Sequence, residues 1–154
     1  MKKLFYSFKH AFTGLFFCLA HERNMRIHIC FCAFVTLFGF ICKISLAEWI
    51  ACIAFMGIVL TAELFNTAIE LAVDKSGTET SNIAKIAKDA SAAAVLVCAI
   101  AAAVCGLLIF AQKERIMMAY NYYCANPLAF VLLILALICA ICFVALTRKG
   151  TNKK

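Results

Sequence analysis

Residues 46–74, LAEWIACIAFMGIVLTAELFNTAIELAVD, decide the fold of this chain. The stretch is apolar over its first half, and about 20 mostly apolar residues suffice for a helix to cross a bilayer. The second half adds Glu63, Asn66, Glu70 and Asp74. On a helix the three acidic residues lie within about 40° of one line, with Asn66 about 60° to one side. The stretch therefore predicts a membrane-spanning helix that carries a polar stripe towards its C-terminal end.

The composition of the whole chain also favours lipid as its solvent. Of the 154 residues, 66% are hydrophobic, and the chain has one proline and six glycines. A soluble domain of this size has too little interior to bury so much apolar surface. Most of the ten cysteines lie inside apolar runs, where they behave as small hydrophobic side chains. One small integral membrane domain is predicted.

The remaining apolar runs predict an all-α membrane protein. An amphipathic helix at about residues 4–20 is expected to lie in the membrane interface, because its aromatic residues recur at helical spacing. A secretory signal peptide is the alternative there, but polar residues interrupt the run and no small-residue cleavage site follows. Spans are expected at about 27–42, 46–73, 90–111 and 128–147, with a polar outer loop over 112–127 and a basic tail over 148–154.

The distribution of charge indicates orientation rather than a nucleic-acid partner. The net charge is +7, but the basic residues cluster at the ends of apolar runs instead of along one solvated face. With both termini cytoplasmic, twelve of the 15 Lys and Arg residues fall in cytoplasmic segments, and only Lys43, Lys113 and Arg115 fall outside. This arrangement places residues 21–26 and 74–89 on the same, cytoplasmic, side.

The acidic stripe is the strongest indication of chemistry. An ionised side chain at the centre of a span costs about 2.5–3.5 kcal/mol on insertion scales, and aligned carboxylates also repel one another. A bound cation would relieve both penalties. Glu22 and the pair Lys88-Asp89 are expected on the same side of the membrane. Carboxylates with a lysine suit phosphoryl transfer through Mg²⁺. A proton or cation transporter would also use buried glutamates. Asp74, taken by itself, is better explained as marking where the helix leaves the membrane.

The sequence lacks the motifs of soluble nucleotide enzymes, such as a P-loop or a Rossmann glycine pattern. It resembles instead the small bacterial membrane lipid kinases of the diacylglycerol kinase and undecaprenol kinase family, from about residue 5 to residue 110. The resemblance rests on SFKHAFTGL (7–15), HERN (21–24), AEWI (47–50), ELFNTAIELAVD (63–74) and AKDASAAAV (87–95). It implies that residues 1–111 form the kinase domain.

The resemblance also implies roles for individual residues. Glu63 would be the catalytic general base and would contact the lipid substrate, while Glu22 and Glu70 would hold the Mg²⁺ that carries ATP. The residues implied for the ATP site are Glu22, Asn66, Glu70, Lys88 and Asp89, with Glu79 and His10 as weaker candidates.

The function implied is ATP- and Mg²⁺-dependent phosphorylation of a membrane lipid alcohol in a bacterial cytoplasmic membrane. The motifs SFKHA and HERN are more similar to the undecaprenol kinase branch, so undecaprenol is favoured over diacylglycerol. A homotrimer with shared sites is implied as well. The span at 128–147 departs from the family's usual three, and a peripheral anchor is favoured for it. The competing functions are a small proton- or cation-coupled transporter, which would not need Lys88-Asp89 or Glu22, and a catalytically dead subunit.

Overall fold

The structure, a computed structural model, describes residues 2–77 and 81–146, and these form six α-helices and no strand. The helices are α1 (Lys2–His21), α2 (Arg23–Ile41), α3 (Leu46–Lys75), α4 (Asn82–Phe110), α5 (Lys113–Ala125) and α6 (Pro127–Ala145). Four of them, α2, α3, α4 and α6, are long and apolar enough to cross a membrane, with mean hydropathy from 1.6 to 3.3. The expected all-α fold with four spans is confirmed.

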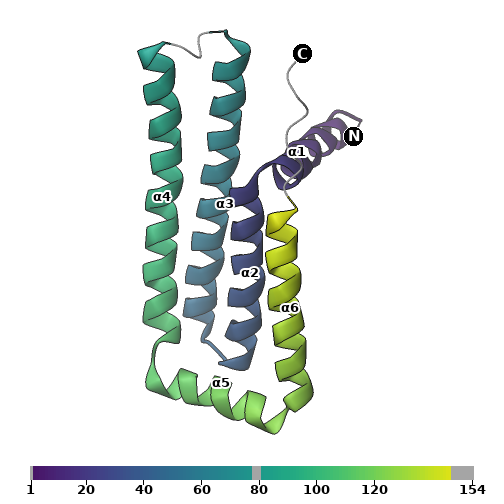
Figure 1. Cartoon of the computed structure of the whole chain (residues 1–154), viewed down its shortest axis with the longest axis vertical. Coiled ribbons are helices and arrows are strands. Elements are labelled where there is room, and N and C mark those ends of the chain that lie inside the picture. The colour runs from purple at the N-terminus through teal and green to yellow at the C-terminus, as the bar shows by residue number, and fades with distance from the viewer. Residues whose placement is uncertain (1, 78–80, 147–154) are drawn as a thin grey trace.

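The four spans stand side by side, and α1 and α5 mark the two ends of the bundle (Figure 1). At one end α1 leaves the bundle at an angle from the start of α2, close to the last turn of α6. At the other end α5 runs across the bundle from α4 to α6. We call these the α1 end and the α5 end. Helix α3 packs along α4 and also against α2, whose other side contacts α6.

Most large apolar side chains point away from the bundle. Phe31 on α2, Leu107 on α4 and Leu132 on α6 are each more than half exposed. None of the residues in the most apolar stretch of α6 is buried. In the corresponding stretch of α3, only 28% of the residues are buried. A protein in water would not leave so much apolar surface uncovered, whereas hydrocarbon covers it at no cost.

Two elements differ from the sequence-based expectation. Helix α4 begins at Asn82 rather than at residue 90, because Ser81 caps it and accepts a hydrogen bond from the Ala84 N–H at 3.1 Å. The connection expected as a loop over 112–127 is mostly helical, as α5. This segment has no glycine before Pro127, and that proline opens the next helix at its first position.

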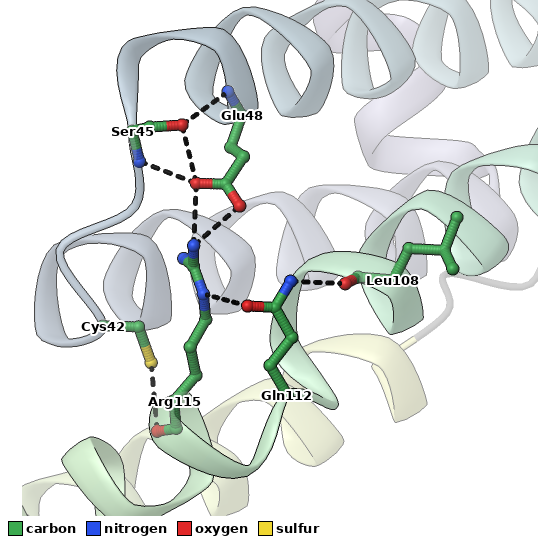
Figure 2. Close-up of polar contacts among 6 residues, drawn as sticks. All are labelled: Cys42, Ser45, Glu48, Leu108, Gln112 and Arg115. Atoms are coloured by element: carbon green, nitrogen blue, oxygen red, sulfur yellow. Dashed lines mark hydrogen bonds and ion pairs between the residues drawn. The ribbon is translucent and has the colours of Figure 1, made fainter.

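A polar cluster joins α5 to the start of α3 at the α5 end (Figure 2). Ser45 and Glu48 form a capping box at the N-terminus of α3. Arg115 of α5 donates from one guanidinium nitrogen to both oxygens of Glu48, at 2.6 and 2.8 Å. Gln112 accepts from Arg115 Nε at 3.4 Å, and the Cys42 thiol donates to the Arg115 carbonyl at 3.7 Å. The ion pair thereby fixes where α5 crosses the bundle.

A close helix contact beside this cluster depends on a glycine. A Cβ atom at Gly39 of α2 would lie 2.6 Å from the ring of Trp49 on α3. Trp49 is half-buried and also packs on Phe40, with ring centroids 5.0 Å apart. Any side chain at Gly39 would therefore displace the Trp49 ring or push α2 and α3 apart.

Candidate active site

The polar stripe of α3 faces the inside of the bundle, near the α1 end. Glu63 is 1% exposed, Thr67 is 2% exposed and Asn66 is 7% exposed. Glu70, one turn further along, is half-buried. The Thr67 hydroxyl donates to the Glu63 carbonyl at 3.1 Å, within the helix. The side chains that the sequence spacing places on one face of the helix are thus the ones that point into the bundle.

A hydrogen-bonded chain fixes the amide of Asn66 between α3 and α4. The hydroxyl of buried Ser91 on α4 lies 2.7 Å from Asn66 Oδ1 and 2.8 Å from the Lys88 carbonyl, and it donates to these oxygens. Asn66 Nδ2 in turn donates to Glu70 Oε1 at 3.0 Å. The amide oxygen and nitrogen each have a partner of the right kind, so the side chain has one satisfied orientation. Ser91 therefore acts on Glu70 through Asn66.

A second bond between α3 and α4 is the ion pair of Lys88 with Asp74. Both side chains are half-buried. Asp74 sits one turn after Glu70 on α3, and Lys88 lies one turn before Ser91 on α4. Lys88 is thus held near the carboxylates of α3.

Glu22 reaches the same place from the corner between α1 and α2. Glu22 is the N-cap residue of α2, and its backbone N–H donates to the Cys18 carbonyl at 2.7 Å. Its side chain is half-buried. Burial raises the pKa of the Glu22 carboxyl, and the charge of Glu70 raises this pKa further. Burial also raises the pKa of the Cys18 thiol on α1, with further contributions from Glu22 and Glu63. Glu22 is therefore close enough to Glu70 for the two carboxylates to interact electrostatically.

The residues present fit a Mg²⁺ ion that is carried with a nucleotide. Within the described residues no three His, Cys, Asp or Glu side chains form a closed metal site. Mg²⁺ does not need one, because it commonly binds one or two carboxylates together with substrate phosphates and water. Glu22 and Glu70 would supply such a pair. Glu63 adds an oxygen, Oε2, that is buried and has no hydrogen-bond partner among the described residues.

Two of the other predicted residues lie outside this cluster. Asp89 on α4 and His10 on α1 are exposed. Glu79 lies outside the described residues. Sequence reasoning missed Ser91 and the pairing of Asp74 with Lys88. Ser91 follows Lys88 by three residues, a spacing that places both on one face of a helix, and this signal could have identified it.

A groove of about 650 Å³ lies between α3 and α4 next to the cluster. Its lining is mostly apolar, with side chains such as Ile58 and Phe65, and it includes Asn66 and Ser91. The groove therefore joins a hydrophobic surface to the polar groups of the candidate site.

Comparison with known proteins identifies the family. Residues 9–110 match the model of the prokaryotic diacylglycerol kinase family. The chain is 38% identical over 113 residues to the undecaprenol kinase of Bacillus subtilis, a match that covers 73% of this chain and 92% of that protein. It is 39% identical over 106 residues to a diacylglycerol kinase of Synechocystis, covering 67% of this chain and 59% of that protein. No solved structure gives a significant match.

The matched residues contain the whole cluster from Cys18 to Ser91 and end where α4 ends, so α5 and α6 lie beyond them. The resemblance inferred from the sequence motifs is confirmed: the chain belongs to the prokaryotic diacylglycerol kinase family of membrane lipid kinases.

Proposed function

We propose that this protein transfers the γ-phosphoryl group of ATP to undecaprenol, giving undecaprenyl phosphate. The observation that carries the proposal is the buried carboxylate of Glu63, one oxygen of which has no hydrogen-bond partner among the described residues. The charges of Glu22 and Glu70 act on this carboxylate. Membership of a lipid kinase family gives this cluster its chemical meaning. Undecaprenol is chosen because the Bacillus relative, matched over most of its length, is an undecaprenol kinase.

Each polar group has a proposed task. Glu63 accepts the proton of the lipid hydroxyl as the oxygen attacks phosphorus. Glu22 and Glu70 would hold Mg²⁺, which would supply positive charge to offset the negative charge of the nucleotide phosphates. Asn66 orients Glu70, and Lys88 faces the transferred phosphoryl group. We keep Asp89, His10 and Glu79 as further contacts to ATP, on the resemblance alone.

The apolar groove between α3 and α4 supports a lipid acceptor. A long hydrocarbon chain in this groove would be in contact with apolar side chains along its length, and the lining includes Asn66, which lies about one helical turn from Glu63 on α3. Diacylglycerol is the second candidate acceptor, because the family model and the Synechocystis relative carry that name.

We further propose that the α1 end faces the cytoplasm, where ATP is available, and that the protein is a homotrimer. The excess of Lys and Arg in the segments at that end supports the orientation. The family resemblance supports the trimer. The division into a kinase domain at 1–111 and an added span at 128–147 is part of the same proposal, and the match over 9–110 supports it.

The test is transfer of ³²P from ATP by the purified protein, with undecaprenol and diacylglycerol offered separately in mixed micelles. We expect label in undecaprenyl phosphate, little in phosphatidate, and none when EDTA removes Mg²⁺. A preference for diacylglycerol would overturn the choice of substrate. The absence of label in both lipids, from protein that is folded and oligomeric, would refute the proposed function.

A further inference from the structure

Arg26 is a buried cation that no step of the proposed function uses. It lies in the first turn of α2, four residues after Glu22, and is 5% exposed. Within the described part of the chain, the partners of its guanidinium are backbone carbonyls and one aromatic ring, not a carboxylate. A buried charge needs compensation, so these contacts hold the side chain in place.

The carbonyls come from the last turns of two different helices. At the end of α1, Arg26 Nε donates to Leu19 at 2.8 Å and Nη2 donates to Ala20. At the end of α6, Nη1 donates to Phe143 at 3.2 Å and to Leu146 at 2.7 Å. The last carbonyls of a helix lack partners within it and carry the negative end of its dipole. One planar guanidinium thus donates hydrogen bonds to carbonyls at two helix ends.

The ring of Phe143 adds a contact from α6 alone. The guanidinium carbon of Arg26 lies 5.5 Å from the centre of that ring, within the range of a cation–π interaction. Helix α6 has no buried residue and packs on α2 and α5. Its last turn is therefore attached to the α1 end of the bundle through Arg26.

The same bonds set the position of Glu22. Leu19 and Ala20 precede Glu22 by three and two residues, and Arg26 follows it by four. Arg26 therefore clamps the chain on both sides of the corner from which the Glu22 side chain reaches α3. A change in the contacts between the Arg26 guanidinium and the last turn of α6 would therefore move this corner.

We propose that the fourth span, α6, contributes to metal binding by the kinase. Its last turn holds the Arg26 guanidinium in place, and Arg26 positions Glu22 for the metal. Arg26 is a positioning residue, since it does not itself reach the carboxylate cluster. This inference rests on the proposed role of Glu22. It gives α6 a task that the expected peripheral anchor lacks.

The test is Mn²⁺ binding to the detergent-solubilised full chain in the presence of a non-hydrolysable ATP analogue, measured by electron paramagnetic resonance. The KM for Mg²⁺ in the kinase assay is a second readout. Arg26→Lys keeps the charge but has a compact group that cannot span both helix ends. We expect it to weaken Mn²⁺ binding roughly tenfold, the lower range for loss of a group that supports a metal ligand. We expect kcat at saturating Mg²⁺ to change little.

Two matched changes on α6 separate its last turn from its other end. Phe143→Leu removes the ring at Arg26, and we expect about threefold weaker Mn²⁺ binding in the wild-type background and no further loss in Arg26→Lys. Phe130→Leu makes the same change near the start of α6, where the ring packs on Tyr123 with centroids 6.1 Å apart. We expect that variant to bind Mn²⁺ like the wild type.

Equal Mn²⁺ affinity in the wild type and Arg26→Lys would overturn the inference, as would equal effects of the two phenylalanine changes. A wild-type protein without Mn²⁺ binding would also overturn it, by removing the site on which Arg26 acts. If the wild type binds Mn²⁺ but labels no lipid, and Arg26→Lys still weakens that binding, the proposed function fails while this inference stands. Circular dichroism and gel filtration of each variant show that the fold is retained.

Discussion

Replacing Ser91 by alanine should weaken catalysis through Asn66 and Glu70. The Ser91 hydroxyl donates across 2.7 Å to Asn66 Oδ1, and both side chains are buried. In Ser91→Ala the amide oxygen loses its donor, and Asn66 no longer has a single satisfied orientation. Its bond to Glu70, 3.0 Å long, is then no longer enforced.

The size of the effect follows from the burial of Asn66. A buried polar atom left without a partner costs about 1–3 kcal/mol, which corresponds to roughly five- to 150-fold in an equilibrium. The Ser91 proton is shared with the Lys88 carbonyl, so the lower part of that range applies. We expect kcat/KM for Mg-ATP to fall about tenfold, with the loss mainly in KM because Glu70 is a proposed metal ligand.

The assay is steady-state ³²P transfer at varied Mg-ATP, with the amount of folded protein measured by gel filtration. Ser91→Thr keeps the hydroxyl and serves as the matched control, for which we expect near-wild-type kcat/KM. An unchanged kcat/KM in Ser91→Ala would refute the reasoning, since the hydrogen-bonded chain would then have no influence on Glu70. An equal loss in both variants would assign the effect to packing.

Two further predictions concern acidity and packing. The raised pKa of the Glu22 carboxyl means that Glu22 takes up its proton at higher pH than an exposed glutamate. Mg²⁺ binding should therefore weaken as the pH falls through this raised pKa. In ¹³C-glutamate NMR spectra of the metal-free protein, Glu70→Gln should lower the pKa of Glu22. Loss of Mg²⁺ binding only at the ordinary glutamate pKa would contradict this. Gly39→Ala should lower stability by about 1–3 kcal/mol in thermal unfolding, because the new methyl group meets Trp49, while Gly106→Ala, with open space around its Cβ position, should be tolerated.

The spans could be predicted because lipid imposes a simple rule on the chain. Long apolar runs have to be helices there, and the sequence shows them directly. The start of α4 was placed eight residues late because residues 82–89 carry three charged side chains, and only the cap at Ser81 shows that the helix has begun. The helical form of α5 was missed because polarity was read as irregular structure.

The candidate site was predictable within one helix and not between helices. The spacing of Glu63, Asn66 and Glu70 on α3 already gives their common face. The pairing of Asp74 with Lys88 depends on how α3 and α4 are aligned, which single-helix periodicity does not contain. The contact of Arg26 with the end of α6 joins residues 120 positions apart and follows only from the packed bundle.

The most direct test of the account is Glu63→Gln, which replaces the proposed base by a group of the same shape that cannot accept the proton. We expect kcat for lipid phosphorylation to fall by about 10²–10⁴-fold, the usual contribution of a general base, while Mg-ATP binding stays within about threefold of the wild type. Glu114→Gln makes the same change at an exposed site in the first turn of α5 and should leave kcat unchanged. Near-normal turnover in Glu63→Gln would contradict the account, because the buried carboxylate would then not take part in the reaction.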